Sequence, residues 1–147
     1  MNSQTPEPQI NNELLEVHSI FHTIQGEGPY VGYPATFIRL SGCNLQCIWC
    51  DTTYTPGFKL SLDDIISAIY PTRLVVITGG EPFRQNIYPL VSLLISKGKL
   101  VQIETNGTIY DEKVIITGAT IVVSPKTKNI DKRFLSCYNV KVKMLYG

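Results

Sequence analysis

The sequence predicts an α/β domain whose strands are mostly parallel. Short runs of β-branched residues alternate with amphipathic helical stretches, a pattern typical of parallel strands joined by crossover helices. Residues 73–78 form an apolar run of the kind that a parallel sheet buries on both faces. Polar turns containing glycine or proline follow four of the strand candidates, which places residues suited to chemistry at one rim of the sheet.

The first predicted elements are a strand over residues 35–40 and a helix that begins at Ser61. The strand ends at a Ser-Gly pair and leads directly into a loop that contains three cysteines. Two acidic residues lie in the first turn after Ser61, and the apolar residues that follow share one helical face. Pro71 is expected to end this helix.

A strand over residues 73–78 and a helix over residues 86–97 come next. The helix tolerates Pro89 only in its first turn, and Gly98 suits the left-handed conformation that terminates helices. Three further strand candidates cover residues 100–105, 121–124 and 139–145, which brings the predicted total to five.

The composition describes one globular domain over residues 1–147, of which residues 1–15 are expected to be flexible. The chain is 44% hydrophobic and 17% charged, with a net charge of +1. No apolar run approaches the roughly 20 residues that cross a bilayer, and the balanced charge offers no basic field for nucleic acid. The opening residues do not resemble a signal peptide, so we expect a cytoplasmic protein with reduced thiols.

Three cysteines lie within eight residues, at Cys43, Cys47 and Cys50. Three thiolates hold an iron–sulfur cluster and leave one iron free for a substrate or cofactor, which predicts catalysis. A structural zinc site is the alternative, but it needs a fourth ligand at a matching spacing. His18 and His22 do not fit that spacing and are assigned to packing or hydrogen bonding. Cys137 stands alone and is expected to be a small buried apolar residue.

Four polar turns are expected to meet at the carboxyl ends of the strands. They are the cysteine loop and the turns over residues 78–82, 104–107 and 124–126. Each turn taken alone has an ordinary conformational explanation, and only their joint placement favours a site. The paired glycines before Glu81 let backbone carbonyls approach an ammonium group, with Gly80 as the expected contact. Glu81 itself is either a catalytic acid or a structural carboxylate.

The cysteine spacing, with Trp49 before the last cysteine, and the Thr-Gly-Gly-Glu-Pro turn over residues 78–82 resemble the radical S-adenosylmethionine (SAM) superfamily. Three segments resemble 7-carboxy-7-deazaguanine synthases more closely: residues 21–30, 37–43 and 50–52. The resemblance runs from about residue 16 to residue 126. It implies a partial (β/α) barrel of the radical SAM type. Relatives are longer, so the chain is expected to be a fragment or a variant shortened at its carboxyl end.

The resemblance also implies roles for particular residues. A 4Fe-4S cluster would be bound by Cys43, Cys47 and Cys50, and Mg²⁺ by Thr52. SAM would be bound by Ile48, Trp49, Asp51, Gly80, Ser124, Pro125 and Lys126. Substrate would be bound by Ile24, Gln25, Gly26, Arg39 and Thr78. Without the resemblance, the Asp-Thr pair after the last cysteine would be interpreted as a turn or a helix cap, and Arg39 as the neutraliser of Glu27 or another acidic neighbour.

The implied reaction is a radical ring contraction. A 5'-deoxyadenosyl radical would take hydrogen from 6-carboxy-5,6,7,8-tetrahydropterin, which would lose ammonia to give 7-carboxy-7-deazaguanine for queuosine-type biosynthesis. The family implies a homodimer and an electron donor such as flavodoxin or ferredoxin. Two alternatives remain at this point: another radical enzyme such as a glycyl-radical activating enzyme, and an inactive iron–sulfur-binding fragment.

Overall fold

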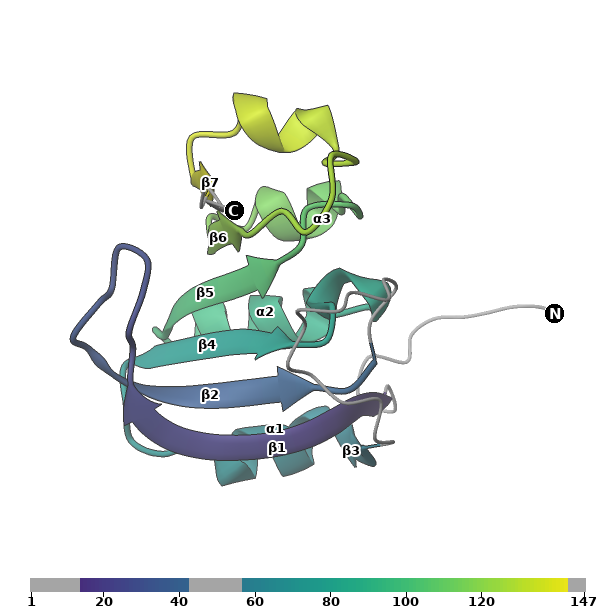
Figure 1. Cartoon of the computed structure of the whole chain (residues 1–147). Coiled ribbons are helices and arrows are strands. Elements are labelled where there is room, and N and C mark those ends of the chain that lie inside the picture. Colours follow the sequence, from purple (N-terminus) through teal and green to yellow (C-terminus); the bar gives the residue numbers. More distant parts are fainter. Residues whose placement is uncertain (1–13, 43–56, 143–147) are drawn as a thin grey trace, which may run out of the picture.

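The computed structural model describes residues 14–42 and 57–142 (Figure 1). These residues form one sheet of seven strands in the spatial order β3-β1-β2-β4-β5-β6-β7. The strands are β1 (Leu14–Ile24), β2 (Pro34–Leu40), β3 (Phe58–Ser61), β4 (Leu74–Gly79), β5 (Leu100–Thr105), β6 (Thr120–Val123) and β7 (Val140–Val142). The α-helices are α1 (Leu62–Ala68), α2 (Tyr88–Ser96) and α3 (Glu112–Ile115), and two 3₁₀ helices are η2 (Pro82–Arg84) and η3 (Lys132–Ser136).

The larger part of the sheet is parallel, as predicted. Strands β2, β4, β5, β6 and β7 run in one direction, while β1 is antiparallel to both of its neighbours, β2 and β3. Figure 1 shows the arrowheads of β2, β4 and β5 at the same end of the sheet. The sequence did not predict β1 or β3. A register shift between Val17 and Ser19 interrupts the alternation of β1 that would have identified it.

The main core lies between the sheet and the helices α1 and α2, which Figure 1 shows on one side of the strands. Its buried members include Ile38, Leu40, Val75 and Ile77 from the sheet, Leu62 and Ile65 from α1, and Leu90 and Leu94 from α2. A second, smaller cluster comprises Ala35, Leu74 and Val76, with Tyr30, Phe37 and Leu100 packed against it. Successive strand residues point to opposite faces, so this second cluster marks the face of the sheet that α1 and α2 leave open.

Both predicted helices form, and their ends follow the expected chemistry. The Ser61 hydroxyl accepts a hydrogen bond from the backbone N–H of Asp64, whose carboxylate accepts one from the N–H of Ser61. Helix α1 ends before Pro71. Pro89 occupies the first turn of α2, and Gly98 beyond its carboxyl end has a φ of +81°. None of the helices in the described part of the chain is long and apolar enough to span a membrane.

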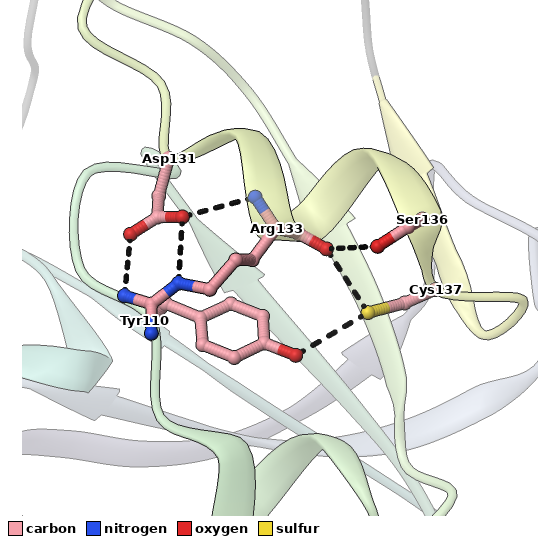
Figure 2. A network of polar contacts seen from close by, with 5 residues as sticks. All are labelled: Tyr110, Asp131, Arg133, Ser136 and Cys137. Atoms are coloured by element: carbon pink, nitrogen blue, oxygen red, sulfur yellow. Dashed lines mark hydrogen bonds and ion pairs between the residues drawn. The ribbon is translucent and has the colours of Figure 1, made fainter.

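A polar network fastens η3 to the segment before α3 (Figure 2). The Arg133 guanidinium lies 4.4 Å from the ring centroid of Tyr110 and bonds to Asp131, and the Tyr110 hydroxyl lies 3.5 Å from the Cys137 sulfur. That contact with Cys137 is the main reason that the pKa of Tyr110 rises to about 12. Cys137 packs against the main core, but it is only half-buried and its thiol donates to the Arg133 carbonyl, so the expected full burial is not observed.

Candidate functional site

The loops after β2 and β4 are joined at the carboxyl rim of the sheet. The backbone N–H of Gly80 donates to the Leu40 carbonyl at 3.2 Å, and that of Glu81 donates to the Gly42 carbonyl at 2.8 Å. Gly79 has a φ of +138°, and a Cβ there would collide with the backbone of Leu40. The first glycine of the pair is therefore required by the contact between two strand ends.

Two side chains that the sequence did not single out hold the segment just before Cys43. Arg84 Nη2 and Gln85 Nε2 both donate to the Ser41 carbonyl, at 3.2 and 3.3 Å. Gln85 also exchanges hydrogen bonds with the backbone of Glu16, whose carboxylate lies 3.5 Å from Arg84. The entry to the cysteine loop is thus tied to η2, which follows the Gly-Gly-Glu-Pro turn.

Glu81 is the structural carboxylate of this rim. It is fully buried, and it accepts hydrogen bonds from the N–H of Phe83 at 2.9 Å, the hydroxyl of Thr105 at 2.6 Å and the N–H of Asn106 at 2.7 Å. Burial raises the pKa of the carboxyl, and the three hydrogen bonds oppose that shift. Since it joins the end of β4 to the end of β5, the structural interpretation of Glu81 is the one that its contacts support.

A cleft of about 320 Å³ lies on the open face of the sheet. Its lining consists of Phe21, Thr23, Ile24, Gln25, Gly26, Glu27, Phe37, Arg39, Thr78 and Glu104. All five residues that the sequence assigned to substrate binding are in this set, although they come from β1, the turn after it, β2 and β4. The structure therefore brings the predicted substrate residues together in one cavity.

The turn over residues 25–33 closes one side of the cleft by reaching across to β5. Gln25 is almost fully buried; its Nε2 donates to Glu104 Oε2 at 3.3 Å, and its Oε1 accepts from the N–H of Glu27 at 3.1 Å. Burial, followed by the charge of Glu27, raises the pKa of Glu104. The sequence analysis missed Glu104 as a site residue, although it opens one of the predicted rim turns.

Arg39 supplies positive charge to the cleft. Its side chain is exposed, and its guanidinium carbon lies 5.4 Å from the ring centroid of Phe21. The rings of Phe21 and Phe37 stack with their centroids 5.4 Å apart and form an apolar wall. The cleft therefore combines a cation, a flat aromatic surface and the carboxylates of Glu27 and Glu104, an arrangement suited to a planar heterocycle that carries an acid group.

Comparison with known proteins identifies the family. Residues 37–117 match the model of the radical SAM superfamily. The chain belongs to this superfamily. Its closely similar relatives include proteins named 7-carboxy-7-deazaguanine synthase from Rhodospirillum rubrum, 43% identical over 88% of this chain, and from Rickettsia prowazekii, 48% identical over 76%. The chain spans 57% and 51% of the lengths of these two relatives.

A solved structure shows the same architecture. The crystal structure of QueE from Escherichia coli matches with a TM-score of 0.69 and 34% sequence identity, over 79% of this chain and 61% of that chain. The sheet of this radical SAM protein is open and mostly parallel, so the predicted fold class is confirmed.

The remaining predicted ligands of a radical SAM site fall into two groups. Cys43, Cys47, Ile48, Trp49, Cys50, Asp51 and Thr52 lie outside the described residues. Gly80, Ser124, Pro125 and Lys126 lie just beyond the carboxyl ends of β4 and β6, where the N–H of Ser124 donates to the Thr105 carbonyl at 2.8 Å. None of these four lines the 320 Å³ cleft, and their assignment to SAM stays a prediction.

Proposed function

We propose that the cleft binds 6-carboxy-5,6,7,8-tetrahydropterin and that the protein converts it to 7-carboxy-7-deazaguanine, with release of ammonia, in queuosine-type biosynthesis. The observation that carries this proposal is the gathering of Ile24, Gln25, Gly26, Arg39 and Thr78 in one cavity. The names of the relatives support the same reaction. They give no support to a glycyl-radical activating enzyme or to an inactive iron–sulfur fragment.

The chemistry of the cleft matches the chemistry of this substrate. In this proposal Arg39 takes the carboxylate in a two-pronged, charge-assisted pair, and the flat pterin packs against the aromatic wall of Phe21 and Phe37, which line the same cleft. The ring presents N–H donors along one edge, and the side chains of Gln25 and Glu104 provide acceptors for them. Gln25, Gly26 and Glu27 of the 25–33 turn border the cleft on that side.

The cysteine triad fits the cofactor that the superfamily implies. Three thiolates are the donor set of a 4Fe-4S cluster with one open iron, and Cys43 follows directly on the segment that Arg84 and Gln85 hold. When bound, the cluster and SAM supply a radical that takes a hydrogen atom from the substrate. Gly80 and residues 124–126, which lie just beyond the carboxyl ends of β4 and β6, would contact SAM, and Thr52 would supply a hard oxygen for Mg²⁺.

Two partners belong to the same proposal. Reductive cleavage of SAM requires an electron donor, for which flavodoxin or ferredoxin is the expected class. The protein is also expected to act as a homodimer in the cytoplasm. Size measurement of the reconstituted protein by light scattering tests the dimer, and SAM cleavage with each purified donor tests the reductant.

The direct test is an anaerobic assay of the reconstituted protein with SAM, a reductant and the tetrahydropterin, followed by mass spectrometry of the products. We expect 7-carboxy-7-deazaguanine, and we expect Arg39→Gln to raise KM by about tenfold or more, because a charge-assisted pair is lost. Arg73→Gln is the matched control, since Arg73 is also exposed but lies before β4, outside the cleft. Equal effects of the two substitutions on KM would contradict the proposed role of the cleft.

A further inference from the structure

Gln102 is an unusual residue for the middle of a parallel strand. It lies on β5 between Val76 of β4 and Thr120 of β6, and its side chain is fully buried. A buried side-chain amide costs free energy unless its polar atoms are paired. Only half of that requirement is met, because Nε2 has a partner and Oε1 has none among the described residues. Stability alone therefore does not explain a glutamine at this position.

The paired half of the Gln102 amide acts on the cleft. Its Nε2 donates to Glu104 Oε2 at 3.1 Å, and Gln25 Nε2 donates to the same oxygen at 3.3 Å. One carboxylate oxygen of Glu104 thus accepts from two amide donors, one two residues earlier on β5 and one from Gln25, which follows β1. Gln102 does not itself line the cleft, so any influence on a ligand passes through Glu104.

The amide group of Gln102 also faces the turn over residues 25–33. A Cβ built on Gly28 would lie 2.9 Å from Gln102 Oε1 and 3.0 Å from its Nε2. Gly28 also has a φ of +79°, which favours glycine over other residues. The turn consequently packs against the flat amide of Gln102 at Gly28, where a side chain would collide with that amide.

We propose that Gln102 is a positioning residue of the cleft, which fixes the carboxylate of Glu104 and supports the 25–33 turn through Gly28. The inference rests on the proposed function only in the identity of the ligand. Whichever heterocycle the cleft binds, Glu104 is oriented to accept hydrogen bonds from the N–H edge of that ring.

Gln102→Met separates this role from a structural one. Methionine keeps the length of the side chain, removes the unpaired buried oxygen and removes the donor to Glu104. We expect the melting temperature to stay the same or rise. The pKa of Glu104 should rise further, because a hydrogen bond to its charged form is lost. Binding of 6-carboxypterin, a stable fluorescent analogue of the proposed substrate, should weaken about tenfold.

The experiment uses the full chain after anaerobic reconstitution. Carboxyl ¹³C NMR follows the titration of Glu104, with its signal assigned by comparison with Glu104→Gln, and fluorescence follows pterin binding. Asn139→Leu is the control, because the Asn139 amide donates to the Ile115 and Ala119 carbonyls and lies outside the cleft. It should lower the melting temperature while leaving the Glu104 titration and pterin binding unchanged.

Each outcome decides one question. An unchanged Glu104 titration in Gln102→Met, or a variant that fails to fold, would overturn the positioning role. Gln102→Asn provides a second check, since its shorter side chain keeps the polarity but not the reach and should shift the titration in the same direction. If the titration shifts but the unsubstituted protein does not bind 6-carboxypterin, the positioning role stands and the pterin assignment is wrong.

Discussion

Glu81→Ala tests whether the rim of the sheet depends on one buried carboxylate. The substitution orphans three donors: the N–H of Phe83, the hydroxyl of Thr105 and the N–H of Asn106. Each buried donor left without a partner costs about 1–3 kcal/mol of stability. Part of that cost is offset, because the substitution also removes a carboxyl group whose burial is unfavourable, as its raised pKa shows. We therefore expect the free energy of unfolding to fall by about 3–5 kcal/mol.

Urea unfolding at pH 7, followed by circular dichroism, measures this loss. Glu81→Gln keeps one oxygen that can accept two of the three hydrogen bonds, so it should lose less, about 1–3 kcal/mol. Glu112→Ala is the control, because Glu112 is exposed and its removal should change the free energy of unfolding by no more than about 0.5 kcal/mol. A loss below about 1 kcal/mol for Glu81→Ala would refute the structural role of this carboxylate.

Three further substitutions or conditions test other parts of the account. Gly79→Ala should lower the free energy of unfolding by about 2–4 kcal/mol in the same assay, because its Cβ meets the Leu40 backbone at a φ of +138°; an unchanged midpoint would contradict this. Ser61→Ala should cost about 1 kcal/mol through loss of the α1 cap, and no loss of helicity or stability would count against the capping box. Glu104 has a raised pKa in the folded state, so its ionisation opposes folding; stability should fall as pH rises from 4.5 through the folded pKa, and Glu104→Gln should remove that part of the fall. Parallel pH profiles for Glu104→Gln and the unsubstituted protein would contradict the assignment.

The parallel half of the sheet was predictable because burial on both faces leaves a continuous apolar run, as in β4. The antiparallel edge was not. Strand β1 is mostly half-buried or exposed after Val17 and has a register shift there, and β3 has only four residues, none fully buried. Neither strand shows the period-two pattern that identifies a strand from sequence.

The candidate site was likewise predictable only in part. Topology alone placed the turns after β2, β4, β5 and β6 at one rim, since parallel strands end on the same side. Resemblance to a family supplied Gln25 and Arg39. The pairing of Gln25 with Glu104, 79 residues later, could not be predicted, because it depends on the 25–33 turn folding across the open face of the sheet. The role proposed for Gln102 could not be predicted either, because it depends on the same position of the 25–33 turn beside Glu104.

The most direct test of the central claim is transfer of deuterium from substrate to cofactor. The reconstituted protein is incubated anaerobically with SAM, a reductant and 6-carboxytetrahydropterin deuterated on its reduced ring, and the recovered SAM and 5'-deoxyadenosine are analysed by mass spectrometry. Conversion of the pterin to 7-carboxy-7-deazaguanine and ammonia is redox-neutral, so a hydrogen atom taken by the radical must be returned before product forms, which regenerates SAM. Radical chemistry at the cleft therefore predicts deuterium on the 5' carbon of the recovered SAM and of any 5'-deoxyadenosine released, with less deuterium when Arg39 is changed to Gln. Product that forms while neither SAM nor 5'-deoxyadenosine carries deuterium would contradict the account.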